Sequence, residues 1–110
     1  MTDKVVVLST AGTAKEAQKL ARALVEARLA ACVNIVPQIR SIYRWKGEIQ
    51  DDAEFLLIIK TTRDLVAQVQ LTITELHSYT VPESIALPIV DGSAAYLEWI
   101  GRETEPEGAV

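Results

Sequence analysis

The sequence is poor in the residues from which cross-links and reactive centres are commonly built. Its 110 residues include one cysteine and one histidine, and aromatic residues make up only 5% of the chain. Because Cys32 has no second cysteine to pair with, an internal disulfide is excluded. The chain also lacks a phosphate-binding glycine loop, closely spaced histidine or cysteine ligands, and a recognisable nucleophile partnered with its histidine. The enzyme classes identified by those motifs are therefore not indicated.

Excess positive charge and long apolar runs are also missing. The formal net charge is -4 and the pI is about 4.9, which argues against a nucleic-acid surface and makes cations the expected partners. No apolar run approaches the roughly 20 residues of a membrane-spanning helix, and no secretory signal pattern opens the chain. We therefore expect a cytoplasmic protein with no membrane or nucleic-acid partner.

Length and apolar content indicate one domain. A chain of 110 residues that is 49% hydrophobic can bury about 65% of its unfolded surface, and a second domain has no room. We expect residues 1–103 to form this domain and the acidic residues 104–110 to be a frayed tail.

The first half of the chain predicts a strand, a helix and a long hairpin. The run Val-Val-Val-Leu within residues 4–9 is typical of a central strand covered on both faces. Thr13 and Glu16 have the spacing of a capping box, so a helix should begin there. Residues 31–59 then form two extended arms around a turn at Lys46-Gly47.

The hairpin is too long for a domain of this size. Its arms could reach about 50 Å, whereas a 110-residue domain has a radius of gyration of about 13 Å. We expect the hairpin to bend or project, and its exposed Ile42, Tyr43 and Trp45 would then need another subunit to cover them.

The second half predicts a helix followed by a strand. An apolar helical stripe ends at His77, and the hydroxyl of Thr61 or Thr62 is expected to cap the start of this helix. Alternation over residues 85–89 indicates a strand, and Pro88 places it at or near a sheet edge because proline cannot donate to the ladder. A short amphipathic helix should follow.

The order of elements is strand, helix, strand, strand, helix, strand, and then an extra C-terminal helix. This order favours an α+β, ferredoxin-like βαββαβ fold with two helices on one face of an antiparallel sheet. The opposite face must meet a partner subunit or a ligand, and together with the projecting hairpin this predicts an oligomer.

Four collinear motifs resemble the CutA family of divalent-cation tolerance proteins, and the match runs from about residue 5 to residue 99. They are Arg28-Leu-Ala-Ala-Cys-Val-Asn-Ile, Ser41-Ile-Tyr-Arg-Trp-Lys-Gly-Glu48, Leu56-Leu-Ile-Ile-Lys-Thr61 and Tyr79-Thr-Val-Pro-Glu-Ser-Ile-Ala-Leu-Pro-Ile89. The resemblance implies a homotrimer like the nitrogen-regulatory signal-transduction trimers, and a cytosolic role linked to copper and other divalent cations. Proposed copper ligands of the family fall on Ser9 and Leu76 here, neither of which suits soft copper.

His77, Glu83 and Cys32 are the candidate metal contacts that remain, for Cu(II) or another divalent cation that folding does not require. His77 ends a helix, where an imidazole also serves by bonding the last carbonyls. Glu83 could equally cap the tight segment after Pro82. Cys32 lies in an apolar run, where a free cysteine is usually a small core residue.

Tyr43, Trp45, Lys60 and Tyr79 are candidates for an intersubunit cleft. Tyr43 and Trp45 alternate along one arm and so face the same side, where trimer packing or ligand stacking would use them. Lys60 is either an anion contact or the first solvated residue after an apolar strand. The acidic residues Asp51, Asp52 and Glu54 could attract cations weakly, but a solvated hairpin edge protected from aggregation by charge is the more common explanation of such a cluster.

Three functions stay open at this point. The first is a non-catalytic trimer linked to divalent-cation tolerance, with weak Cu(II) binding. The second is a small-molecule-sensing signal-transduction trimer that presents a loop to an unknown protein partner. The third is a small trimeric enzyme with an acid–base site between subunits, built from His77, Tyr79 and Glu83 with Lys60 or Tyr43.

Overall fold

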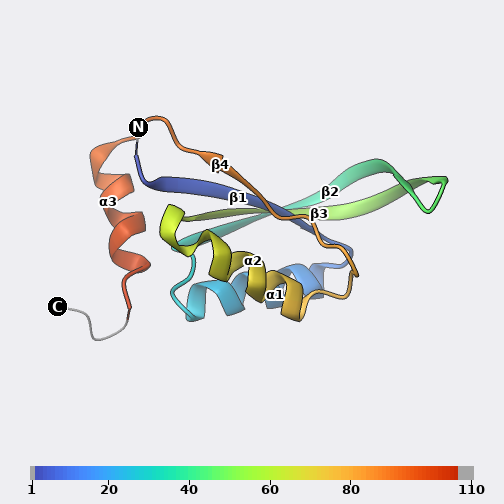
Figure 1. Ribbon diagram of the computed structural model, residues 1–110, viewed down its shortest axis with the longest axis horizontal. Helices are drawn as coiled ribbons and strands as arrows, with labels where there is room; N and C mark the ends of the chain where they lie inside the picture. Colours follow the sequence, from blue (N-terminus) through green and yellow to red (C-terminus); the bar gives the residue numbers. More distant parts are fainter. Residues whose placement is uncertain (1, 107–110) are drawn as a thin grey trace.

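The computed structural model describes residues 2–106 and shows an α+β fold. Four antiparallel strands form one sheet in the order β2-β3-β1-β4. Within residues 2–106, three α-helices and one 3-10 turn accompany the sheet (Figure 1). The elements are β1 (Lys4–Ala11), α1 (Ala14–Glu26), β2 (Cys32–Trp45), β3 (Glu48–Thr62), the 3-10 turn η1 (Arg63–Leu65), α2 (Val66–Leu76), β4 (Ile85–Pro88) and α3 (Ala94–Glu103).

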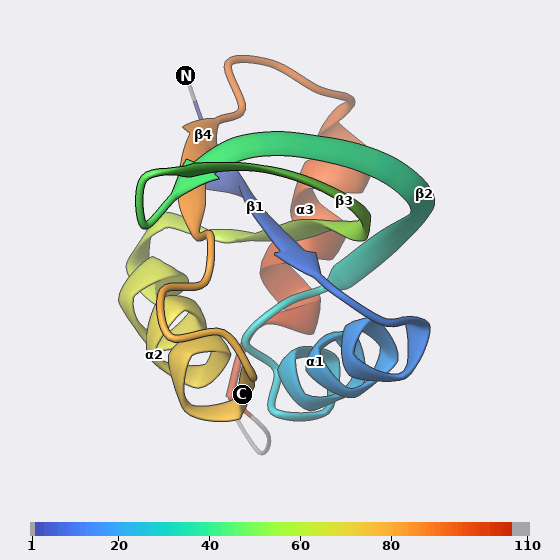
Figure 2. The same ribbon diagram turned by 90° about the vertical axis from the view of Figure 1, so that its right-hand side faces the viewer.

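The core lies between the sheet and the two helices α1 and α2, which occupy the same side of it (Figure 2). Residues paired across neighbouring strands share a face, and Val5 and Val7 of β1 lie on the same face as Ile59 of β3. Leu20 and Leu24 of α1 with Val69 and Ile73 of α2 pack into this cluster and are fully buried. As predicted, β1 is central and the proline-containing β4 is an edge strand.

The opposite face of the sheet is also apolar. By the same register, Val6, Leu8, Leu56, Ile58, Ile85 and Leu87 lie on it. We call these six residues the open face. None of the six is buried in the single chain, and Ile85 and Leu87 are about half exposed. A sheet face of this composition normally packs against another layer.

The β2–β3 hairpin projects from the helices, as its length requires, and the molecule measures 50 × 27 × 22 Å (Figure 1). A register shift between Val36 and Ile39 bends β2, and Gln38 there has a positive φ of 61°. At the tip, Lys46 and Gly47 both have positive φ, which gives a tight turn.

Helix starts agree with the sequence in one case and differ in the other. The Thr13 hydroxyl accepts the Glu16 N–H at 3.1 Å and caps α1. The Glu16 carboxylate accepts the Ser78 N–H at 2.8 Å, 62 residues away, and within the described residues it makes no bond to the Thr13 N–H that would complete the capping box. The prediction of a threonine cap for the next helix is wrong: Thr62 makes no side-chain cap, and the buried Thr61 hydroxyl donates to the Leu29 carbonyl at 2.7 Å.

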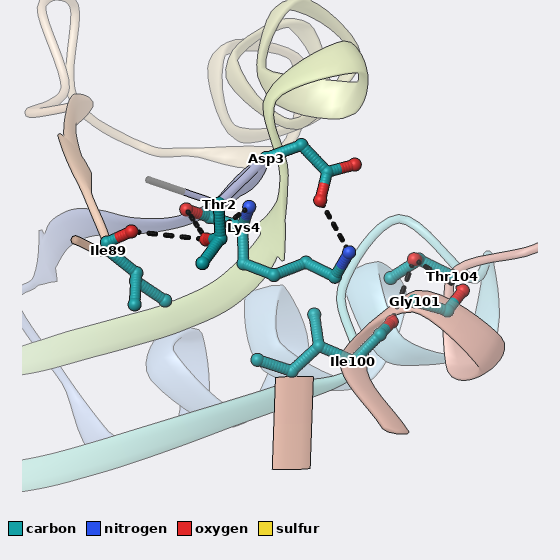
Figure 3. Close-up of polar contacts among 7 residues, drawn as sticks. All are labelled: Thr2, Asp3, Lys4, Ile89, Ile100, Gly101 and Thr104. Atoms are coloured by element: carbon teal, nitrogen blue, oxygen red, sulfur yellow. Dashed lines mark hydrogen bonds and ion pairs between the residues drawn. The ribbon is translucent and has the colours of Figure 1, made fainter. Parts of the chain in front are cut away.

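The end of α3 is packed against the start of β1. Thr104 is buried and its hydroxyl donates to the carbonyls of Ile100 and Gly101 at 2.8 and 3.1 Å, close to the ion pair between Lys4 and Asp3 (Figure 3). Arg28 donates to the carbonyls of Glu105 and Arg102 from the other side. The first residues of the expected tail are therefore tied to the domain, and the tail residues 107–110 lie outside the described residues.

Candidate functional site

A cleft of about 730 Å³ lies where the hairpin leaves the body of the sheet. Its walls are the outer arm of β2, Thr10 and Glu54 on the central strands, and the loop of residues 78–83. That loop follows α2 and passes beside the hairpin before β4 begins (Figure 1). The helix ends because His77 takes an extended conformation with ψ of 145°, and Pro82 keeps the following segment out of a helix.

His77 lies behind the cleft, and its side chain is fully buried. Its backbone N–H donates to the Ile73 carbonyl at 2.9 Å and ends α2. The ring Nδ1 accepts the Tyr79 N–H at 3.0 Å, so the proton is on Nε2, which donates to the Thr10 carbonyl at 2.6 Å. The imidazole is therefore neutral, and neither nitrogen has a lone pair free for a metal.

Glu16 completes this buried junction. Its carboxylate lies 3.8 Å from Nδ1 of His77, but with Nδ1 acting as an acceptor this contact is not an ion pair. Burial alone would raise the pKa of Glu16, yet the hydrogen bonds from Ser78 outweigh it and hold the pKa below its ordinary value. The ionised Glu16 therefore fastens the start of the loop to α1.

The three candidate metal contacts are not brought together. Cys32 is paired with Lys60, and Thr10, which bonds His77, is paired with Leu56. Four residues along β3 separate these pairs by about 13 Å. Glu83 lines the cleft, whereas Cys32 and His77 do not. Among residues 2–106, no group of three histidine, cysteine or acidic side chains could hold a metal ion.

Ser9 and Leu76, at the proposed ligand positions of the family, have structural roles here. The Ser9 side chain is fully buried, and its hydroxyl donates to the Glu83 carbonyl at 2.8 Å. Leu76 packs against the hydrophobic core. Ser9 therefore anchors the loop that carries Glu83.

Tyr79 and Glu54 form the central contact of the cleft. The Tyr79 hydroxyl donates to Oε2 of Glu54 at 2.7 Å, and Glu54 is only 5% exposed. The reading of Glu54 as part of a solvated edge is therefore wrong, because the loop folds over it. Burial and then the Glu54 charge raise the pKa of Tyr79 far above its ordinary value, so the phenol stays protonated as a donor. Gly12 permits this approach: a Cβ there would lie 3.1 Å from the hydroxyl.

The other polar groups of the cleft differ in whether a hydrogen-bonding partner holds them. Arg40 is held by two hydrogen bonds to Asp51, at 2.8 and 3.2 Å. Tyr43 donates to Asp52 at 2.6 Å. Burial, followed by the charge of Glu54, raises the pKa of Glu83 above its ordinary value. Glu54 and Glu83 therefore share the cleft as two carboxylates.

Three of the four expected cleft residues do meet in this structure. Tyr43, Trp45 and Tyr79 line the same cleft, while Lys60 lies on the sheet away from it and bonds Asn34. Sequence reasoning missed the role of Glu54, although its polar side chain directly before the apolar run 55–59 was a signal. Arg40 and Thr10 carried no such signal.

Comparison with known proteins assigns the family. The family model described as CutA1 divalent ion tolerance protein matches residues 5–103. The chain belongs to the CutA family. The divalent-cation tolerance protein CutA of Thermus thermophilus is 50% identical over 99 residues, covering 90% of this chain and 96% of that protein. A CutA protein of Arabidopsis thaliana, described as chloroplastic, is 48% identical over 100 residues, covering 91% of this chain and 55% of the relative.

Solved CutA structures share the fold. CutA of Xylella fastidiosa superposes with a TM-score of 0.92 at 38% identity and covers 94% of this chain and 100% of its own. The Thermus thermophilus structure gives a TM-score of 0.86 and covers 88% and 94%. This CutA chain spans nearly the whole bacterial relative but about half the length of the Arabidopsis relative, and of the mouse and human ones. Among the described residues, no helix has the length and apolar character needed to cross a membrane.

Proposed function

We propose that this CutA chain works as a non-catalytic homotrimer in divalent-cation tolerance. The observation that carries the proposal is the open face, six partly exposed apolar side chains on one side of the sheet, together with a projecting hairpin whose Ile42 is 68% exposed. Surfaces of this kind are covered by partner subunits in stable proteins. A ferredoxin-like arrangement whose open faces meet around a threefold axis would bury them.

Light scattering coupled to size exclusion tests the trimer directly. We expect a mass three times that of the chain across a wide concentration range. Leu87→Lys, which places a charge on the open face, should weaken the assembly. Leu71→Lys is the matched control, because Leu71 is an exposed leucine on α2 outside that face. A stable monomer for the parent chain would contradict the proposal.

Cation binding in this proposal is weak and made through oxygen atoms. His77 has no free nitrogen and Cys32 lies far from the cleft, so Glu83 is the predicted metal contact that a divalent ion reaches first. In a Cu(II) titration, Glu83→Gln should lower the affinity, whereas Cys32→Ser should leave it unchanged. A loss on Cys32→Ser with no effect of Glu83→Gln would reverse this assignment.

A small-molecule-sensing trimer is the second candidate function, and the cleft favours it. A volume of about 730 Å³ with aromatic walls falls within the range of pockets that take small ligands. An unbiased metabolite screen by thermal shift tests this function. A trimer that no metabolite stabilises would count against it.

The acid–base enzyme receives less support. The Tyr79 phenol is held protonated, both ring nitrogens of His77 are engaged, and Lys60 lies outside the cleft. Of the expected set, this leaves the exposed Glu83 carboxylate as the accessible base, without a free acid partner among the described residues. A cytoplasmic location remains our prediction for this chain, and fractionation of cells expressing it from its own gene would check that prediction.

A further inference from the structure

The cleft has the size of a small-molecule site and not that of a metal centre. Its volume of about 730 Å³ is far larger than one metal ion with its ligands requires. A divalent ion bound weakly at Glu83 would fill little of this volume, and the described residues offer no group of three His, Cys, Asp or Glu side chains for a tight metal centre. The expected occupant is therefore an organic molecule.

The charge in the cleft selects for a positive ligand. Glu54 and Glu83 are carboxylates that line it, and Glu54 is almost completely buried. Among the described residues that line it, Arg40 alone is basic, and its guanidinium is already paired with Asp51 through two hydrogen bonds. An anion placed here would face two carboxylates with no free cation to offset them, whereas a cation would relieve their repulsion.

The aromatic rings suit the same ligand. Tyr43, Trp45 and Tyr79 line the cleft along with the two carboxylates. The faces of such rings attract ammonium and guanidinium groups, and the attraction grows when water is excluded. The Tyr79 hydroxyl bonds one oxygen of Glu54 and so holds the carboxylate in the wall of the cleft. Rings and carboxylates together form the kind of cage that recognises an alkylammonium group.

We propose that the cleft bounded by Tyr43, Trp45, Tyr79, Glu54 and Glu83 binds a small organic cation carrying one or more alkylammonium groups. The inference goes beyond divalent-cation tolerance and rests on the second candidate function, small-molecule binding. Glu54 and Glu83 hold the ammonium, and the rings cover its alkyl part. If the hairpin of a neighbouring subunit covers these rings instead, the native assembly will not bind such a cation.

Calorimetric titration of the native assembly with 1,4-diaminobutane tests the proposal. Low ionic strength is needed because salt screens such contacts. 1,4-Butanediol, which has the same length without charge, is the matched ligand control, and quenching of Trp45 fluorescence in a Trp99→Phe background gives a second readout. We expect the diamine to bind and quench, and the diol to do neither.

Two isosteric variants locate the site. Glu83→Gln and Glu54→Gln each remove one charge, and the amide at position 54 can still accept from Tyr79. Each should weaken diamine binding by about tenfold or more. Glu98→Gln, outside the cleft, should leave it unchanged. Because Glu83 is exposed, its variant stays informative even if position 54 does not tolerate the change.

The proposal is overturned if the diamine does not bind at millimolar concentration, if the diol binds equally well, or if both amide variants bind like the parent chain. Failure of this kind is distinguishable from failure of the main proposal. The trimer mass and the Cu(II) titration are measured without the diamine, so a normal trimer with normal Cu(II) response and no diamine binding refutes the organic-cation site alone.

Discussion

Replacing Tyr79 by phenylalanine should destabilise the fold by stranding the Glu54 carboxylate. The hydroxyl is the donor to Oε2 at 2.7 Å, and Glu54 is 5% exposed, so little water can replace the lost bond. A hydrogen bond to a charged group contributes about 1.5–3 kcal/mol. Tyr79 itself is 36% exposed, and solvent screening brings the expected loss to about 1–2 kcal/mol.

Urea unfolding at one fixed protein concentration measures this loss. With a slope of roughly 1–2 kcal/mol per molar urea, the midpoint should fall by roughly 1 M while the slope stays unchanged. Tyr96→Phe is the matched control, because Tyr96 is similarly exposed and its hydroxyl makes no hydrogen bond within the described residues. The concentration must be fixed because assembly contributes to the apparent stability.

A double-mutant cycle with Glu54→Gln assigns the loss to the pair. If the charge is the cause, removing it first should make Tyr79→Phe less costly, with a coupling energy of about 1 kcal/mol. A coupling energy below about 0.5 kcal/mol, within the error of such cycles, would refute the reasoning. The phenol would then act through ring packing alone.

Four further predictions concern other residues. The pKa of Glu16 lies below its ordinary value of 4.5, so its carboxylate stabilises the fold above pH 4.5, and this stabilisation is lost as the pH falls through the folded-state pKa. In urea melts, Glu16→Gln should therefore lower the free energy of unfolding at pH 7 and lower it much less at pH 3. The pKa of Glu83 is raised, so its ionised form destabilises the fold, and Glu83→Gln should increase the free energy of unfolding at pH 7. This increase should disappear as the solution is acidified. For either variant, an equal effect at pH 7 and pH 3 would contradict the pKa shift assigned to that residue. Gly12→Ala should lower the free energy of unfolding by about 1 kcal/mol, measured by thermal denaturation, because its Cβ meets the Tyr79 hydroxyl. The loss should be smaller in a Tyr79→Phe background, where the nearest remaining contact of the Cβ is at 3.8 Å. An equal loss in both backgrounds would exclude that clash. Gln38→Gly should raise the free energy of unfolding by up to about 1 kcal/mol, since the positive φ of 61° strains a side chain there, and a decrease would show that the glutamine side chain stabilises the bulge.

Much of the sheet could be predicted because the signals are local. The β-branched run of β1 forms a central strand in which Val5 and Val7 are buried, and Pro88 places β4 at the edge because proline has no N–H to donate. The length of the β2–β3 arms, compared with the size of a small domain, predicted a projecting hairpin.

The interior of the site could not be predicted because its contacts are far apart in sequence. Glu54 looks like one of three hairpin acids, and only the loop that returns 25 residues later buries it beneath Tyr79. The partner of His77 is a backbone carbonyl 67 residues away. Thr61 and Thr62 were equal cap candidates, and packing of Thr61 against Leu29 decided the outcome.

The contacts of Ser9, Leu76 and His77 determine which side chains remain available to bind a ligand in the cleft. Ser9 uses its hydroxyl to hold the Glu83 loop, Leu76 fills the core, and His77 commits both ring nitrogens to backbone partners. For copper to use His77, at least one of those hydrogen bonds must break, at a cost of about 1–3 kcal/mol, or roughly tenfold to a hundredfold in affinity. Soft-metal capture is therefore disfavoured by the same contacts that build the loop. In the functions proposed for this CutA chain, cation recognition is therefore assigned to the carboxylates and rings that line the cleft.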